Sequence, residues 1–193
     1  HDYVNFLCQV CGDQATGGGQ MGENTSWDVD TGTGKLTFSG SGALETSGEA
    51  PWTGFEAAIQ EVVIGSGITE VDPSIFAGCD SLTDILVENG NSHYRSRDGV
   101  LLSKDGTTLV KYPNGRVDAE YTVPESVTHI ESNAFTGCDG LDVIRFTGSM
   151  PQLEEDAFTG LTATIYYPGD ASGWDKDKLQ NYGGNITWIP VYN

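Results

Sequence analysis

The chain has 193 residues with 28 acidic and 9 basic side chains, which gives a formal net charge of −19. Nucleic acids and anionic membrane surfaces attract clustered Lys and Arg, so this balance argues against both as partners. Aromatic residues make up 10% of the chain, too many for a disordered acidic tail, and the 26 glycines favour many turns and short strands.

Candidate metal ligands lie at the N-terminus. Cys8 and Cys11 form a C-x-x-C pair, which together with His1 supplies ligand types that zinc prefers. A fourth ligand would come from Asp2, His93, a water or a histidine upstream of this chain. The segment is therefore a candidate structural zinc site, with a local disulfide or two free thiols as the alternatives, and we expect no other cofactor.

A β-hairpin is predicted next, followed by a short helix. Apolar residues at 27–29 and 35–38 alternate on either side of the turn 31–34, which contains two glycines. Residues 52–59 are expected to form a short helix that leads into the repeats.

Internal repeats dominate the middle of the chain. At an offset of 59, the segment 64–82 aligns with 123–141, and a third copy follows after a further 23 residues. A period near 23 is typical of leucine-rich repeats and other solenoids. In the second copy Ser132–Gly137 is expected to form one helical turn with Phe135 pointing inward, and Gly137 to end it in the left-handed conformation. A single unit cannot bury its apolar face alone, so neighbouring units must stack.

An insertion, residues 88–120, separates the first two copies. Two apolar runs flank Asp105–Gly106, a strong hairpin signal. The insertion holds five basic and five acidic residues, whereas the rest of the chain is strongly acidic. Because function in repeat proteins tends to sit on irregular loops that project from the regular frame, we expect the insertion to project in this way and to carry a binding surface. Its candidate residues are Tyr94, Arg95, Arg97, Lys104, Lys111 and Tyr112.

The C-terminal segment is expected to close the solenoid. Residues 164–167 and 186–192 read as strands, and residues 174–181 as a short helix. The abundant aromatic residues of this segment would seal the open end of the core.

Cys79 and Cys138 occupy equivalent positions of the first two repeats. A disulfide between them is not expected, because at least one intervening turn of chain would hold them beyond the ~7 Å that bridging allows. We expect both to be buried as small apolar residues.

The repeat resembles a known family. The pattern ending in Phe135-Thr-Gly-Cys138-x-x-Leu141 is similar to the BspA-like, or Treponema-type, leucine-rich repeat of surface proteins from gut and oral bacteria. Segments around Trp27 and Trp188 are similar to the flanks of such repeats. The resemblance implies an extracellular or cell-surface protein with a role in adhesion or host contact.

The fold expected is therefore β-rich (α+β), a short leucine-rich-repeat solenoid with a hairpin insertion and a capping segment at each end. We divide it into a Cys/His leader (1–20), an N-terminal hairpin cap (21–58), the solenoid (59–163, insertion 88–120) and a C-terminal cap (164–193). No nucleophile motif, phosphate loop or catalytic histidine arrangement is apparent.

The function expected is a non-enzymatic extracellular binding module that acts as a monomer. Its ligand would be a host or matrix protein or a glycan, with no nucleic acid and no membrane insertion in this segment; a signal or anchor would lie outside the chain. The alternative is a structural spacer within a larger surface protein whose function lies in other domains.

Overall fold

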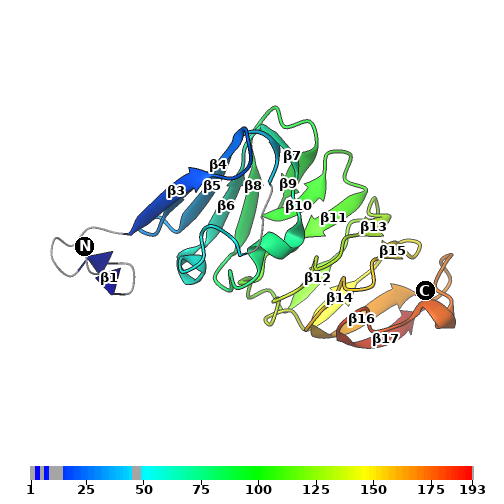
Figure 1. Cartoon of the computed structure of the whole chain (residues 1–193). Coiled ribbons are helices and arrows are strands. Elements are labelled where there is room, and N and C mark those ends of the chain that lie inside the picture. Colours follow the sequence, from blue (N-terminus) through cyan, green and yellow to red (C-terminus); the bar gives the residue numbers. More distant parts are fainter. Residues whose placement is uncertain (1–2, 5–6, 9–14, 45–48, 193) are drawn as a thin grey trace.

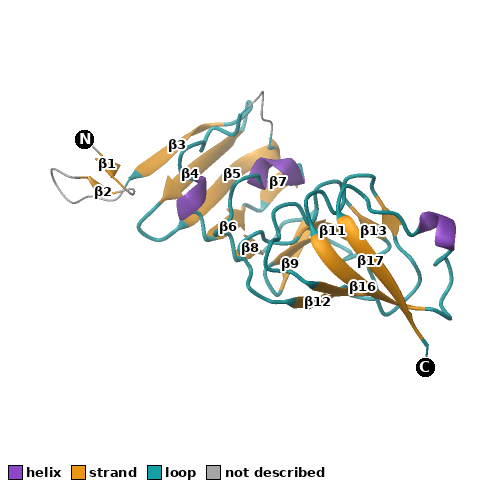
Figure 2. Ribbon diagram, turned by 90° about the horizontal axis from the view of Figure 1, so that it is seen from below, coloured by secondary structure: helices purple, strands orange, loops and turns teal. Residues whose placement is uncertain are grey.

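The computed structural model describes residues 3–4, 7–8, 15–44 and 49–192. Within these residues the chain forms short β-strands and single-turn 3-10 helices, and no α-helix (Figures 1 and 2). The 3-10 helices span Glu56–Ala58, Pro73–Phe76 and Lys176–Lys178. The strands stack along one axis from the N-terminal to the C-terminal end, as Figure 1 shows. The architecture is therefore the expected β-rich solenoid.

The N-terminal part is built on a sheet in which β7 also pairs with β5. Its strands are β3 (Thr16–Gln20), β4 (Thr25–Asp30), β5 (Lys35–Ala43), β6 (Glu61–Ile64), β7 (Gly67–Glu70) and β8 (Asp84–Val87). Strands β4 and β5 form the predicted hairpin, and β5, β6 and β8 then run parallel. Apart from this sheet, β1 (Tyr3–Val4) and β2 (Leu7–Cys8) form a separate antiparallel pair.

Two further sheets enclose the C-terminal core. The first is wholly parallel and consists of β12 (Glu120–Thr122), β14 (Val143–Arg145), β16 (Thr162–Pro168) and β17 (Asn185–Val191). The second has the order β15-β13-β11-β10-β9, with bounds β9 (Tyr94–Arg97), β10 (Val100–Ser103), β11 (Thr108–Lys111), β13 (His129–Ile130) and β15 (Gln152–Leu153).

The repeats stack in register as the sequence predicts. Strand β13 pairs with β15 in parallel, with Ile130 opposite Leu153, which is the offset of 23. Phe135 and Phe158 are fully buried, and their ring centroids lie 5.5 Å apart. Both turns end in a left-handed glycine, since φ is +77° at Gly137 and at Gly160. The turn from Ser132 to Gly137 is a succession of hydrogen-bonded turns and not a regular helix.

The hairpin of the insertion occupies an interior position. Strands β10 and β11 pair around Asp105–Gly106 as predicted, and β11 then pairs in parallel with β13. Leu101 and Val110 pack into the N-terminal core, whereas Leu102 and Leu109 pack into the C-terminal core. This hairpin therefore separates two apolar cores, and it forms one turn of the solenoid itself. The expectation that it projects from the frame as an irregular loop is wrong.

The ends of the solenoid are closed by aromatic side chains. The predicted helices at 52–59 and 174–181 are each reduced to a three-residue 3-10 turn. Trp52 is fully buried, with its ring 5.1 Å from that of Phe38. At the other end the ring of Trp174 stacks 4.8 Å from that of Tyr167. Large aromatic rings therefore cover each open end of the core, although the helices expected there are only single turns.

Candidate functional site

The outer face of the four-stranded parallel sheet carries a row of aligned side chains. Thr122, Arg145, Tyr166 and Ile189 are neighbours across β12, β14, β16 and β17. Side chains alternate between the two faces of a strand. Since Ile144 is fully buried in the core beneath, this row points away from the core.

Arg145 is held in place at the centre of this row. Its guanidinium carbon lies 4.4 Å from the centroid of the Tyr166 ring, and its Nε donates to Glu120 Oε1 at 2.6 Å. The hydrogen bond from Arg145 lowers the pKa of the Glu120 carboxyl and raises that of the guanidinium. A planar cation stacked on a ring and fixed by a carboxylate loses little freedom on binding a partner. We call Glu120, Arg145 and Tyr166, with the half-buried Val143 and Ile189, the outer-face patch.

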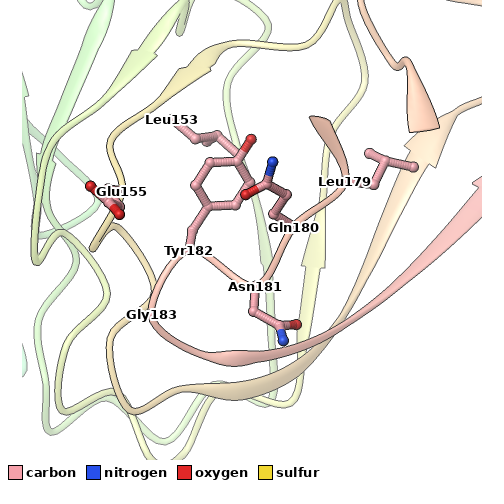
Figure 3. Close-up of a pocket in the computed structure, with 7 residues that line it drawn as sticks. All are labelled: Leu153, Glu155, Leu179, Gln180, Asn181, Tyr182 and Gly183. Atoms are coloured by element: carbon pink, nitrogen blue, oxygen red, sulfur yellow. The ribbon is translucent and has the colours of Figure 1, made fainter. Parts of the chain in front are cut away.

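A groove opens beside β15 at the C-terminal end of the second sheet (Figure 3). Its volume is about 650 Å³, and its lining consists of Leu153, Glu155, Leu179, Gln180, Asn181, Tyr182 and Gly183. Figure 3 shows the Tyr182 ring between Leu153 and the Gln180 side chain, with Glu155 on the opposite side of the groove. The Tyr182 hydroxyl donates to the carbonyl of Lys178 at 2.6 Å. This groove can hold an elongated ligand with both apolar and polar groups.

Four of the candidate binding residues in the insertion remain at the surface. Arg97 and Lys104 are exposed, and Tyr94 and Arg95 are half-buried. Tyr94 has a structural contact, because its hydroxyl accepts a hydrogen bond from the Val71 N–H at 3.0 Å. Arg95 lies across the hairpin turn at Gly106. Three of these side chains come from β9 and the fourth follows β10, whereas Lys111 and Tyr112 are buried and cannot share a surface with them.

Lys111 and Tyr112 are corrections to the predicted binding surface. Each is 1% exposed, so neither side chain is available to a partner. The Lys111 ammonium donates to the carbonyl of Thr136 at 2.8 Å, in the turn of the next repeat. The Tyr112 ring stacks on Phe135, with centroids 5.7 Å apart. Basic residues of the insertion thus serve partly to join turns of the solenoid.

The predicted zinc site lies largely outside the described residues. His1 and Cys11 are among the residues not described, and only the backbone of Cys8 is placed, in β2. Among the described residues no three His, Cys, Asp or Glu side chains come together as metal ligands. His93 Nδ1 lies 3.0 Å from the Ser92 hydroxyl. The zinc site therefore stays a prediction.

Cys79 and Cys138 are buried free thiols, as expected. The hairpin turn of chain lies between their repeats, because Asn114 donates from its side chain to the Phe76 carbonyl while the Tyr112 N–H donates to Ala134. Burial raises the pKa of Cys79 to about 12 and that of Cys138 to about 11. Both thiols are therefore protonated at neutral pH.

The outer-face patch was missed from the sequence, although a signal for it is present. The period of 23 places Arg145 in register with Thr122, and strand alternation places both on the face opposite Ile144. Tyr166, in contrast, follows Arg145 by 21 residues and not 23, so the repeat period alone does not place these two side chains beside each other. The five basic residues of the insertion favoured a different surface.

Fold and repeat geometry together define a class: a short solenoid of leucine-rich-repeat type. The chain belongs to the family described as BspA type leucine rich repeat region, whose model matches residues 41–97 and 119–168, more than half of the sequence. The unmatched stretch between them, residues 98–118, contains the whole β10–β11 hairpin. Repeat proteins of this family and fold are typically non-enzymatic interaction or surface modules.

Solved structures with detectable similarity include three bacterial proteins. A leucine-rich repeat protein from Eubacterium ventriosum is 18% identical, with 92% of this chain and 73% of that chain covered and a TM-score of 0.49. A leucine rich cell surface protein from Faecalibacterium prausnitzii is 19% identical (69% and 48% covered, TM-score 0.41). The pneumococcal vaccine antigen PcpA is 16% identical (69% and 56% covered, TM-score 0.38). No curated protein matches the sequence.

The described part of the chain contains no helix of the length and apolarity that crossing a membrane requires.

Proposed function

We propose that this chain is a non-enzymatic, extracellular protein-binding module of a bacterial surface protein, and that the outer-face patch is its contact surface. The observation that supports this function best is the stack of Arg145 on Tyr166, at 4.4 Å, on the outer face of the parallel sheet. Tyr and Arg are enriched among the residues that dominate protein–protein affinity.

The composition of the patch favours a protein over a glycan as ligand. Val143 and Ile189 are half-buried beside the stack, and Val191 at the end of β17 is 42% exposed. An apolar surface around a central aromatic–guanidinium pair is typical of the buried centre of a protein interface. The remaining acidic surface, with a net charge of −19 over the chain, keeps such a module soluble and limits non-specific contacts.

Binding to an array of purified extracellular matrix proteins, mucins and glycans tests this function. The double variant Arg145→Glu/Tyr166→Ser should lower affinity for a bound protein at least tenfold. Lys35→Glu is the matched control. Lys35 pairs with Glu61 at 2.7 Å on the outer face of the N-terminal sheet, away from the patch. Binding of no protein at all would support a spacer instead, and binding of glycans alone would contradict a protein ligand.

A further inference from the structure

The edge of the five-stranded sheet at β15 has free backbone groups. The N–H groups of Gln152 and Glu154 donate to Thr128 and Ile130, at 2.8 and 3.1 Å, and so point toward β13. Backbone groups alternate in direction along a strand, so the N–H and C=O of Leu153 point away from β13, toward the groove that Leu153 lines. Within the described residues neither group has a hydrogen-bond partner.

The next turn of chain covers only part of this edge. The Met150 N–H donates to the carbonyl of Ser172 at 3.0 Å, and the Trp174 indole donates to Gly148 at 3.0 Å. After Trp174 the chain forms the 3-10 turn Lys176–Lys178 in place of a strand. The position that a sixth strand would take beside Leu153 is therefore left as the groove.

The walls of the groove fit an extended peptide. Leu153, Leu179 and Tyr182 give the lining its apolar surface, and the side-chain amides of Gln180 and Asn181 supply polar groups. An added strand would pair with Leu153 through its backbone and place alternate side chains into and out of the groove. The volume of about 650 Å³ is adequate for several such side chains.

The charge around the groove indicates the chemistry of the peptide. Residues 151–184 include six acidic and two basic side chains, and one of the basic ones, Lys178, is paired with Asp175 at 3.2 Å. Glu155 lines the groove, is exposed, and has no ion-pair partner among the described residues. The carboxylate of its neighbour Glu154 lies 2.9 Å from Nε2 of His129. An unpaired carboxylate in an acidic setting favours a cationic side chain on the ligand.

We propose that this groove binds an extended peptide segment of a partner protein that carries basic side chains. The segment adds a strand to β15 by hydrogen bonding to the backbone of Leu153, and a Lys or Arg of the segment pairs with Glu155. This surface is distinct from the outer-face patch, so the two sites can be tested separately.

Two synthetic peptides probe the groove on the whole chain. Acetyl-TKVKVKT-amide has the strand propensity and charge that the groove requires, and acetyl-TEVEVET-amide has the same strand propensity with opposite charge. We expect the first to bind at least tenfold more tightly than the second in a calorimetric or fluorescence titration. Two further versions of the first peptide carry N-methyl groups on one or the other set of alternate backbone amides. The version methylated on the set that faces Leu153 should not bind, and the other version should.

NMR and charge variants complete the test. In a ¹⁵N-labelled sample the Leu153 amide should be unprotected when free and gain protection from hydrogen exchange with the Lys peptide. Glu155→Lys should weaken binding at least tenfold, whereas Glu125→Lys, the same change at an exposed residue outside the groove lining, should not. The Arg145→Glu/Tyr166→Ser variant should still bind the peptide.

Three results would overturn the proposal. The first is equal affinity for the two peptides, and the second is protection that does not include Leu153. The third is a wild-type dimer that Glu155→Lys dissociates, because the occupant of the groove would then be a second copy of this chain.

Discussion

The ammonium nitrogen of Lys111 lies 2.8 Å from the carbonyl oxygen of Thr136, which joins the interior hairpin to the turn of the following repeat. The same nitrogen lies 3.4 Å from the carbonyl of Ala134. Carbonyl groups at the end of a turn have no partner within it, and a cation satisfies them. A residue that the sequence places among exposed basic side chains is therefore a buried connection between rungs.

This burial predicts a pH-dependent stability. Desolvation lowers the pKa of Lys111 from 10.5 to about 8 in the folded chain. Between these values the unfolded chain retains the proton that the folded chain has released, so the free energy of unfolding should rise with pH in this window. The rise should be on the order of 3 kcal/mol relative to Lys111→Met, measured by urea denaturation from pH 7 to 10.5. Parallel curves for the two proteins would contradict the burial of a titrating ammonium.

The repeat glycines provide a matched pair of substitutions. Gly137 and Gly160 share φ of +77°, so alanine at either should cost about 1–2 kcal/mol of stability from the left-handed backbone. A Cβ at Gly137 would also lie 3.0 Å from the side-chain nitrogen of Asn114, whereas at Gly160 nothing lies within 4 Å. Gly137→Ala should therefore be the more destabilising by about 1 kcal/mol in chemical denaturation. Equal losses would show that the Asn114 side chain moves away without cost.

Asn91 is a buried side chain with every polar atom in use. Its Nδ2 donates to the carbonyls of Gly65 and Ile68 at 2.9 and 3.0 Å, and its Oδ1 accepts from the N–H groups of His93 and Tyr94. In Asn91→Asp a carboxylate would face the two carbonyl oxygens, which should cost about 3 kcal/mol or more at pH 7.

The pH dependence distinguishes this mechanism from a simple loss of packing. The unfavourable environment raises the pKa of the new carboxyl, so its penalty is present above that pKa and declines as the pH falls and the group protonates. Thermal unfolding of Asn91→Asp should therefore approach that of the wild type as the pH is lowered toward 4. Asn24→Asp, at an exposed position, serves as the control and should show no such recovery.

The two buried thiols should be chemically silent in the native state. Burial raises the pKa of Cys79 to about 12 and that of Cys138 to about 11, and the thiolate is the reactive form. At pH 8 iodoacetamide should leave both unmodified in the folded chain and modify both in 6 M guanidinium, as judged by peptide mass spectrometry. Rapid native labelling at either position would show that its repeat opens readily.

Local signals account for what the sequence predicted well. The offset of 59 and 23 residues located the stacked repeats, and Asp105–Gly106 located the hairpin between β10 and β11. Left-handed Gly137 followed from the chemistry of a turn end. Each of these features depends on neighbouring residues or on internal comparison, which one sequence supplies.

The interior position of the hairpin was harder to predict from the sequence than its strands and turn. Val100, Leu101 and Leu102 are all buried, because the two faces of β10 meet different cores. A continuous apolar run without alternation is typical of a strand covered on both faces, and it argued against an exposed loop. Partners such as Thr136 for Lys111, 25 residues away, follow from stacking and could not be inferred from charge counts.

The proposed function places the ligand contact on the outer-face patch and not on the exposed residues of the insertion, such as Arg97. Photo-crosslinking tests it most directly, with p-benzoylphenylalanine in place of Tyr166 in one variant and of Arg97 in another, each mixed with a protein that the array identifies. We predict a specific crosslink from position 166 and none from position 97, both exposed or half-exposed in the free chain. A crosslink from position 97 without one from position 166 would contradict the outer-face patch as the contact surface and would place the binding site on the insertion.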